Sequence, residues 1–554
     1  MKFGKKNHNS NSRRVFNIMS LYDQFISNRM ITKESLEQLN NPDHPTLYGT
    51  WLFNNLLYQI RAAKGHVVIL PDFDMDGIMA GSLGCAGLRA LGFNCDLYHP
   101  DPRNGYGFTP NDIDKILKQF PDVTTIITCD VGITCFDGID YAAARGIEVI
   151  VTDHHVELTN HVPVNAVVRI DPSSRLDTYP NKSICGAHVL WQLITSFDKL
   201  YGNQASHDAI SWLRICAGIA TMSDSMAMIK ENRKLVKEML QGLNILTTRL
   251  PQIEPNVQRL LRGFQLFMKR VPSASGTIDQ TYLSFNLIPT FNAVKRMGDS
   301  SDDAFLVFFG EEQEQIDAIN RLIDLNEKKK LAVSQYMTDL TVTIQPLAPY
   351  IYFTDAPMGI CGLLATNLNK QSGVTTLVIN NDELSGSGRS PLNAIDLWSK
   401  DFPIAGHQHA FGVDFASRKQ AQEMYQAIKE ATASTPVSIR ASQVDVHAES
   451  NTPLTEIEDF LDRIQEFAPF GPGFPLPRVS ITFDPSDANF KLLSAGKHLK
   501  ATLPNGVDVL LWNLGGKLTD FIQAEHVNLI GTFGYNYFKD KKTVQFNVDK
   551  IFFE

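Results

Sequence analysis

Four short runs of aliphatic and β-branched residues restrict the fold of this 554-residue chain more than any other feature. Helix-like segments such as 78–91 and 138–145 separate most of these runs. Because strands that alternate with helices build βαβ units, this order predicts an α/β fold with a parallel sheet. The runs are His66–Leu70, Val123–Thr128, Ile147–Thr152 and Val164–Ile170.

Acidic residues follow three of these runs closely. The first run leads to Asp72, Asp74 and Asp76, the second to Asp130, and the third to Asp153. In an open parallel sheet, the functional site lies beyond the carboxyl ends of the strands. We therefore expect these carboxylates to belong to one site.

The rest of the chain changes character twice. Residues 183–345 have mostly helical spacing and end in the charged segment 311–339, which either links two lobes or forms a solvated surface helix. A glycine-rich mixed α/β block follows, and the turn-rich Pro469–Pro475 then introduces alternating runs that predict a small β-barrel.

We predict five parts: an N-terminal tail and helical segment over 1–63, a catalytic α/β domain over 64–235, a helical region with a long connecting helix over 236–345, a second mixed α/β domain over 346–434, and a linker with an OB-like barrel over 435–554.

Composition indicates a soluble protein. Hydrophobic residues make up 43% of the chain, and no apolar run is long enough to span a membrane. The basic N-terminus lacks the apolar stretch of a signal peptide, and seven cysteines without a Cys-x-x-Cys pair fit a reducing compartment. We therefore expect a cytoplasmic protein without a membrane partner. A net charge of -9 argues against a protein that coats nucleic acid by bulk positive charge.

The segment Asp72–Gly77 places three carboxylates at alternate positions. Their mutual repulsion is relieved if a cation lies between them, so the segment predicts a metal site. A solvated acidic turn is the alternative. Gly77 then permits a tight exit into the following helix.

Asp153 is followed by two histidines, His154 and His155. An imidazole can bind a metal while a neighbouring aspartate orients it. A site rich in oxygen with one histidine suits Mn²⁺ or Mg²⁺ better than a structural Zn²⁺. Asp130 could bridge two such ions, which together can activate water and stabilise displacement at phosphorus.

These motifs, in this order, resemble the DHH phosphoesterase superfamily, and the chain from about Val67 onward resembles its RecJ branch of single-strand exonucleases. Further motifs support the resemblance along the chain. They are Gly105–Gly107, Cys185–His188, Met222–Asp224, Glu231–Arg233, Arg296–Gly298, Ser387–Ser390, Gly406–Gly412 and Pro469–Gly473.

The resemblance implies a DHH domain with two divalent cations, Mn²⁺ or Mg²⁺. It assigns His155 to the scissile phosphate as a charge stabiliser or proton donor, and Asp153 to the orientation of the histidines. Where superfamily members often have a histidine, this chain has Leu70, and Asp72 compensates as a ligand. One ion is implied at Asp76, Asp130, His154 and Asp224, and the other at Asp74 and the bridging Asp130.

The resemblance also implies residues that bind nucleic acid. In the region that resembles the DHH-associated domain, Ser387, Arg389, Gly406 and His407 are expected to bind a nucleotide phosphate, and Arg103 is expected to assist. A separate His-x-His metal site or a plain glycine turn is the alternative for 406–409. In the OB-like domain, basic and aromatic residues interleave, as a stacking surface for single strands requires. We expect Lys497, Lys500, Trp512 and Tyr535 to bind the strand.

The implied function is a two-metal exonuclease that hydrolyses single-stranded DNA, from 5′ to 3′, to 5′-mononucleotides in DNA repair, recombination or replication. One alternative is a DHH phosphodiesterase for cyclic dinucleotides or short oligonucleotides, and another is a non-catalytic replication scaffold. We expect a monomer, with a single-strand-binding protein or a helicase as partners.

Overall fold

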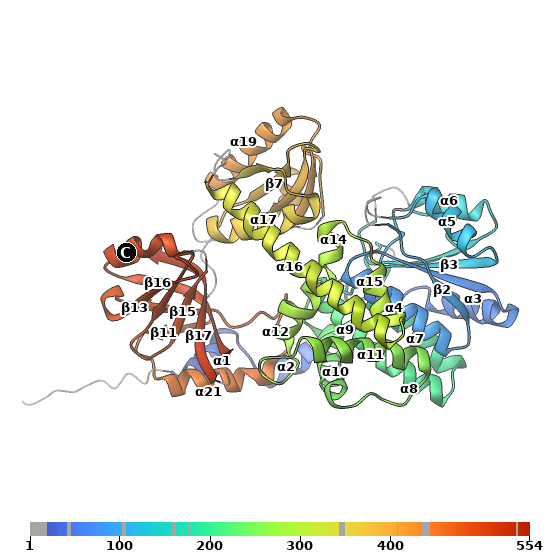
Figure 1. Cartoon of the computed structure of the whole chain (residues 1–554), viewed down its shortest axis with the longest axis horizontal. Helices are drawn as coiled ribbons and strands as arrows, with labels where there is room; N and C mark the ends of the chain where they lie inside the picture. Colours follow the sequence, from blue (N-terminus) through green and yellow to red (C-terminus); the bar gives the residue numbers. More distant parts are fainter. Residues whose placement is uncertain are drawn as a thin grey trace, which may run out of the picture. The chain divides into compact units, whose positions relative to one another are not determined.

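The computed structural model describes residues 19–40, 46–101, 107–157, 162–175, 177–342, 350–406, 408–434, 444–512, 514–538 and 541–553. The chain divides into two compact units (Figure 1). Unit 1 comprises Met1–Leu36, Ser442–Ala468 and Leu476–Glu554, and unit 2 comprises Glu37–Ala441 and Pro469–Pro475. The predicted N-terminal segment 1–63 is therefore shared between the two units.

Unit 2 contains the parallel sheet that the β-branched runs predict. Its strand order is β2-β1-β3-β4-β5, and every neighbouring pair is parallel. The strands are β1 (His66–Pro71), β2 (Asn94–Leu97), β3 (Val123–Cys129), β4 (Glu148–Thr152) and β5 (Val168–Ile170).

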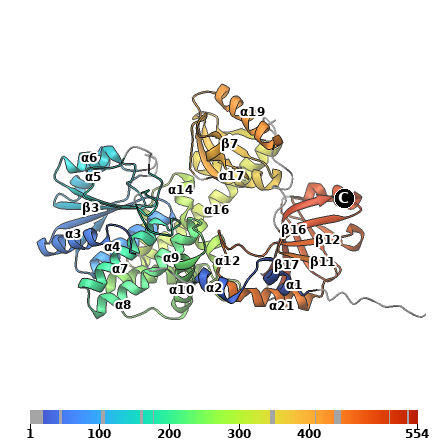
Figure 2. The same cartoon turned by 180° about the vertical axis from the view of Figure 1, so that it is seen from behind.

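Helices cover both faces of this sheet, as the apolar runs require. Side chains alternate along β1, so Val67 and Ile69 join one core while Val68 and Leu70 join another. α5 and α6 lie on one side of β3, and α4 and α7 lie on the other (Figures 1 and 2). These helices are α4 (Met75–Ala90), α5 (Pro110–Gln119), α6 (Phe136–Ala143) and α7 (Gly186–Tyr201).

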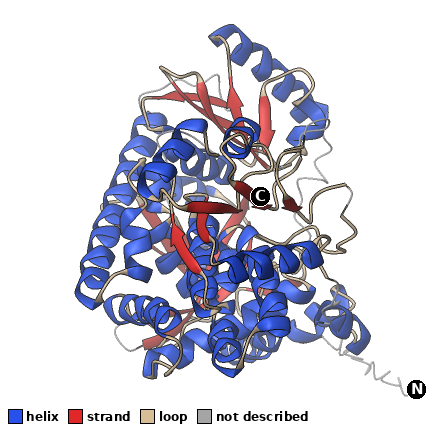
Figure 3. Cartoon of the chain, turned by 90° about the vertical axis from the view of Figure 1, so that its right-hand side faces the viewer, coloured by secondary structure: helices blue, strands red, loops and turns tan. Residues whose placement is uncertain are grey.

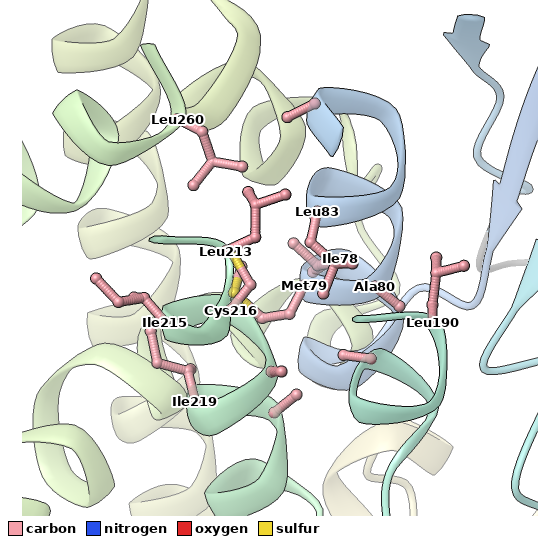
Figure 4. Packing of buried hydrophobic residues seen from close by; sticks show 14 of the residues in the cluster. Ile78, Met79, Ala80, Leu83, Leu190, Leu213, Ile215, Cys216, Ile219 and Leu260 are labelled. Atoms are coloured by element: carbon pink, nitrogen blue, oxygen red, sulfur yellow. The ribbon is translucent and has the colours of Figure 1, made fainter. Parts of the chain in front are cut away.

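α4 is buried along most of its length because helices of the following region surround it (Figure 4). Ile78 and Leu83 of α4 pack with Leu213 and Cys216, near the start of α9, and with Leu260 of α11. Unit 2 is mostly helical here (Figure 3). Its further helices are α3 (Thr50–Ala63), α8 (Gln204–Trp212), α9 (Arg214–Ser223), α10 (Lys230–Thr248), α11 (Pro255–Arg270), α12 (Gln280–Tyr282), the π-helix η2 (Leu283–Leu287), α13 (Ile288–Phe291), α14 (Ala293–Met297) and α15 (Asp302–Phe309).

The charged segment predicted as a connecting helix forms α16 (Glu312–Val342). Its first half packs in the helical core through Ala318, Ile319 and Leu322. Its second half packs against α17 (Met358–Ser372) of the next domain through Val333 and Tyr336, among others. A helix of 31 residues is about 46 Å long. It therefore links two lobes of unit 2, as one of the two predicted alternatives states.

The second sheet of unit 2 is mixed, with the order β6-β7-β8-β10-β9. β6 and β7 are parallel, and the remaining pairs are antiparallel. Its apolar core contains Ile351, Leu377, Trp398 and Phe411. The elements are β6 (Ile351–Thr354), β7 (Thr376–Asn380), β8 (Ser385–Arg389), α18 (Ala394–Trp398), β9 (Ile404–Gly406), β10 (Ala410–Asp414) and α19 (Arg418–Ser434).

Unit 1 contains a seven-stranded sheet with the order β11-β12-β16-β17-β15-β14-β13. α1 (Leu21–Asn28) packs on it, with Phe25 edge-on to Phe460 and Phe467. Helix α2 (Lys33–Asn40) begins in unit 1 and ends in unit 2. The other elements of unit 1 are β11 (Val446–Glu449), α21 (Leu454–Ile464), η3 (Gln465–Phe467), β12 (Val479–Phe483), η4 (Pro485–Asp487), β13 (Asn489–Leu493), β14 (His498–Thr502), β15 (Asp508–Leu511), η5 (Gly515–Lys517), α22 (Leu518–Gln523), β16 (Val527–Phe538) and β17 (Lys541–Phe553).

The segment Pro469–Pro475 belongs to unit 2, although it lies between strands of unit 1 in the sequence. The buried guanidinium of Arg233 donates a hydrogen bond to the carbonyl oxygen of Pro469 and lies over the Phe474 ring. Within the described parts of the chain, no helix is long and apolar enough to cross a bilayer.

Candidate metal centre

The acidic residues that follow β1, β3 and β4 meet at one edge of the parallel sheet. These three strands are neighbours, so their carboxyl ends lie side by side. Three overlapping groups of side chains could each hold a cation, because their ligand atoms lie within 4.8 Å of one another. The groups are Asp130 with His154 and His155, Asp76 with His154 and Asp224, and Asp72 with Asp74 and Asp130.

Asp74 is the N-cap of α4. Its Oδ1 accepts hydrogen bonds from the backbone N–H groups of Asp76, at 3.0 Å, and Gly77, at 3.3 Å. A Cβ at Gly77 would lie 2.2 Å from the carbonyl oxygen of Asp72, so only glycine allows this exit from the strand. The turn from β1 into α4 thus holds all three carboxylates of the motif at the strand end.

Asp76 binds the first turn of α7. Its two carboxylate oxygens accept the N–H groups of Gly186, at 2.7 Å, and Ala187, at 2.9 Å. The helix N-terminus stabilises the charge of this carboxylate. Burial nevertheless raises the pKa of Asp76, so the helix does not fully replace the lost hydration.

Asp130 adopts a left-handed backbone with φ 63°. Such a conformation is costly for a residue other than glycine and is typical of functional sites. Its Oδ1 is buried and, among the described residues, accepts no hydrogen bond, although His154 Nε2 lies 3.0 Å away. Burial and the neighbouring carboxylates, Asp76 first, raise the pKa of Asp130 far above its ordinary value.

His154 Nε2 also lies close to two further carboxylates. It is 3.7 Å from Oδ2 of Asp76 and 3.6 Å from Oδ2 of Asp224. Burial lowers the pKa of His154, which favours the neutral imidazole that a metal requires. Asp224 is the C-cap of α9 and is 31% exposed. Burial, followed by repulsion from Asp76 and Asp74, raises its pKa to about 8.

Asp153 holds His155. Its Oδ1 lies 2.8 Å from His155 Nδ1 and also accepts the backbone N–H groups of both histidines. Its Oδ2 accepts the N–H of Ile133 at 2.9 Å. Burial alone would lower the pKa of His155, but the hydrogen bond and charge of Asp153, together with the charges of Asp224 and Asp72, raise that pKa to about 9. The imidazole is therefore protonated at neutral pH.

Lys295 of α14 is a site residue that sequence reasoning missed. Its Nζ lies 3.0 Å from Oδ2 of Asp74 and 3.5 Å from Oδ2 of Asp72. Burial alone would raise the pKa of Asp74. The charge and the hydrogen bond of Lys295 outweigh burial and lower this pKa to about 2. Asp72 is more deeply enclosed, and burial raises its pKa to about 6. Nearby, the Asn292 side chain accepts the N–H of Met75 at 3.0 Å.

The donor set fits divalent cations that prefer oxygen. Burial raises the pKa of Asp76, Asp130 and Asp224, whereas Lys295 pairs with Asp72 and Asp74. Asp72 Oδ1 and Asp130 Oδ1 are buried and accept no hydrogen bond from the residues that the structure describes. Mn²⁺ or Mg²⁺ would satisfy both the charge and these oxygens.

Hydrogen bonds to side chains of the same domain fix the guanidinium of Arg389. Its Nη1 donates to Ser387 Oγ at 2.9 Å, and its Nε donates to Thr366 Oγ1 at 3.1 Å. Burial, followed by repulsion from Arg296 of α14, lowers the pKa of Arg389. Arg296 therefore lies near enough to affect the charge of Arg389, a proximity that the sequence did not predict.

Of the other predicted nucleotide-binding residues, the structure describes Gly406 but not Arg103 or His407. Gly406 has a left-handed φ of 126° at the end of β9. Arg103 and His407 lie outside the described residues.

The predicted strand-binding residues of unit 1 have different surroundings. Trp512 is 56% exposed, and its ring lies edge-on to His498. Lys497 is exposed. Lys500 pairs with Asp508 at 2.8 Å, and the Tyr535 hydroxyl donates to Asp462 at 2.7 Å. Lys500 and Tyr535 are partly buried, whereas Trp512 and Lys497 are exposed.

Two family models match parts of this chain. Residues 66–219 match the N-terminal domain of the DHH family, and residues 449–550 match the RecJ OB domain. These matches confirm the resemblance that the motifs indicate.

Curated proteins and solved structures show similarity over most of the length. The single-stranded-DNA-specific exonuclease RecJ of Haemophilus influenzae is 23% identical over 566 residues, which cover 95% of this chain and 94% of that protein. The protein of the same name from Escherichia coli is 24% identical over 540 residues, covering 90% and 89%. The crystal structure of Thermus thermophilus RecJ in complex with Mn²⁺ aligns with a TM-score of 0.73 at 20% identity, covering 96% of this chain and 75% of that one. The fold is therefore that of RecJ.

Proposed function

We propose that this chain, which carries a DHH family N-terminal domain at residues 66–219 and a RecJ OB domain at residues 449–550, is a metal-dependent exonuclease specific for single-stranded DNA. The observation that carries this proposal is the convergence of five aspartates and His154 at the carboxyl ends of adjacent parallel strands. The similar proteins of Haemophilus influenzae and Escherichia coli are named for this activity.

The cluster is assigned to two cations, Mn²⁺ or Mg²⁺. Asp130 would contribute to both, and Asp72 would add a ligand to the second ion where Leu70 provides none. When bound, the pair would lower the pKa of the attacking water and offset the charge of the phosphodiester. One ion would be held by Asp76, Asp130, His154 and Asp224, and the other by Asp72, Asp74 and Asp130.

Residues around the cations position the reacting groups. His155 stays protonated through its bond to Asp153 and provides positive charge or a proton to the scissile phosphate. Lys295 holds Asp72 and Asp74 in place.

The other domains bind the strand. Arg389 offers a planar fork to the terminal phosphate, assisted by Ser387, Gly406, His407 and Arg103. Lys497, Lys500, Trp512 and Tyr535 hold the strand further along by charge and stacking. We assign domain boundaries of 64–235 to catalysis, 346–434 to the strand end and 435–554 to the trailing strand.

The products are 5′-mononucleotides, released in the 5′ to 3′ direction. The reaction serves DNA repair, recombination or replication in the cytoplasm.

The protein acts as a monomer beside a single-strand-binding protein or a helicase. Light scattering coupled to size exclusion tests the oligomeric state, since a dimer at micromolar concentration contradicts it.

A panel of end-labelled substrates tests the activity. Single-stranded DNA, duplex DNA, RNA and a dinucleotide are each incubated with the full chain and Mn²⁺ or Mg²⁺. We expect mononucleotides from single-stranded DNA, with the 5′ label released first. Faster turnover of the dinucleotide than of the long strand would instead identify a phosphodiesterase for short substrates, and no turnover at all would identify a scaffold.

A further inference from the structure

The two groups of ligands at the metal centre face different charges. The first site consists of Asp76, Asp130, His154 and Asp224, and the second site consists of Asp72, Asp74 and Asp130. In the described parts of the chain, histidines form the only ion pairs with carboxylates of the first site. A lysine, Lys295, pairs with the two carboxylates that belong to the second site alone. The second site therefore already holds one positive charge of the protein itself.

Asp74 has one oxygen to offer a cation, and Lys295 contacts that oxygen. The other oxygen, Oδ1, accepts the backbone N–H groups of Asp76 and Gly77 at the start of α4. The Nζ of Lys295 lies 3.0 Å from Oδ2 of Asp74 and donates a hydrogen bond to it. An ion bound at Oδ2 would meet the ammonium at the same oxygen, where like charges repel. The ion and the ammonium therefore compete for Asp74.

Asp72 and Phe73 keep the ammonium beside the second site. The Nζ of Lys295 lies 3.5 Å from Oδ2 of Asp72 and 4.9 Å from the centre of the Phe73 ring. Both contacts favour a cation at this position. The competitor of the second ion is thus fixed in place by the same segment that supplies the ligands.

The second site should bind a divalent ion more weakly than the first. The ammonium of Lys295 cancels the charge of one of the two carboxylates that it contacts. Leu70 is apolar and buried, so it adds no ligand to this site. Because the affinity of a carboxylate site for a divalent cation depends on the charge of its ligands, the second site is the weaker one.

Lys295 has a route out of the site. Its side chain is 32% exposed, and its ammonium is at the end of a flexible four-carbon stem. The ammonium can therefore turn toward solvent while the backbone of Lys295 stays in α14.

We propose that Lys295 is a built-in competitor of the second divalent ion. The first site fills at a low concentration of Mn²⁺, and the second fills only as the ammonium leaves Asp74 for solvent. Activity that needs both ions then depends on the concentration at which the second ion displaces Lys295. This inference rests on the two-ion centre of the proposed function, but it concerns metal binding and not hydrolysis.

Calorimetric titration of the metal-free full chain with Mn²⁺ tests the order of binding. We expect two ions per chain, with the second bound at least about 30-fold more weakly than the first. Lys295→Met keeps an unbranched side chain but removes the charge, so its second ion should bind at least about tenfold more tightly than that of the parent. Lys419→Met also breaks a lysine–carboxylate pair, on α19, and should bind both ions like the parent.

Three results of the titrations would overturn the proposal. The first is a parent chain that binds two ions with equal affinity, and the second is a Lys295→Met chain whose second ion binds no more tightly than that of the parent. The third is loss of both ions in Lys295→Met, which would show that Lys295 only positions the carboxylates. Lys295→Arg keeps the charge and should keep the second ion weak, so a tighter second ion in this variant would contradict competition by charge.

Acetylation of the parent chain tests the displacement without any variant. Acetic anhydride modifies lysine amines that reach solvent, and mass spectrometry of the digested protein measures the modification of each lysine. Acetylation of Lys295 should become at least about threefold faster as the second ion binds, while that of the exposed Lys419 stays constant. Acetylation of Lys295 that stays constant or slows as the second ion binds would overturn the proposal.

Metal binding and hydrolysis can fail separately. A chain that binds two ions in this order but releases no nucleotides from single-stranded DNA would contradict the proposed function and support this inference. A chain that degrades the strand but binds two ions with equal affinity would contradict this inference alone.

Discussion

The carboxylate of Asp153 lies 2.8 Å from Nδ1 of His155, and against the effect of burial it is the main contributor, before Asp224 and Asp72, to a pKa of about 9 for that imidazole. The same carboxylate accepts three backbone N–H groups, so it is fixed before any substrate binds.

Replacing Asp153 by Asn should lower the pKa of His155 toward or below 6.5. The nuclease rate of Asp153→Asn should then fall more at pH 8 than at pH 6, because the imidazole loses its proton within that range. Rates from pH 5.5 to 9, with thermal unfolding as a check on the fold, measure this. A uniform loss at every pH would show that Asp153 acts only through structure.

Gly186→Ala should disrupt the metal centre. The added methyl would lie 2.5 Å from the Asp130 Cβ, and overpacking of this kind costs about 1–3 kcal/mol. The displaced α7 would also release Asp76 from its two N–H donors. We expect weaker Mn²⁺ binding by calorimetry, whereas Gly516→Ala, where no atom lies within 4 Å, should bind Mn²⁺ like the parent. Unchanged Mn²⁺ affinity in Gly186→Ala would contradict this packing argument.

Stability should depend on pH and metal together. The raised pKa of Asp224, about 8, means that without metal its contribution to stability is present at low pH and lost as pH rises through 8. A divalent cation needs the ionised carboxylates, so it should protect the fold more at pH 9 than at pH 6. Mg²⁺ at a hundredfold excess over Kd adds about 2.7 kcal/mol. Equal shifts of the melting temperature at both pH values would contradict this.

Arg389→Lys should impair binding of the strand end more than turnover. A lysine cannot reproduce the bonds to Ser387 and Thr366 that aim the guanidinium. We expect KM for 5′-phosphorylated single-stranded DNA to rise about tenfold with kcat nearly unchanged. Arg418→Lys, at an arginine of the same domain that lies over the Phe353 ring, is the matched control. A fall in kcat alone would place Arg389 at the chemistry instead.

Much of the metal centre could be predicted because its residues follow strands. Asp74, Asp130 and Asp153 follow apolar β-branched runs within four residues, and the geometry of a parallel sheet brings such positions together. Asp224 ends a helix and carries no local signal, so only the resemblance to a family indicated it. Its oxygen nonetheless lies 3.6 Å from His154.

The features that were missed depend on contacts between distant segments. Lys295 is 221 residues from Asp74, and a lysine on a short helix has no distinctive pattern. Strand β2 (Asn94–Leu97) contains no β-branched residue, so its sequence does not indicate a strand. The assignment of α1 to unit 1 follows from the packing of Phe25 on Phe460, a pairing that periodicity cannot indicate.

The most direct test of the account is the rate at which Mn²⁺-loaded Asp130→Asn releases nucleotides from end-labelled single-stranded DNA. Because Asp130 bridges both cations in this account, the rate should fall at least about 1000-fold, or about 4 kcal/mol in the barrier, while the exposed Asp140→Asn retains the parent rate. An Asp130→Asn protein that folds normally and degrades the strand as fast as the parent would contradict the account.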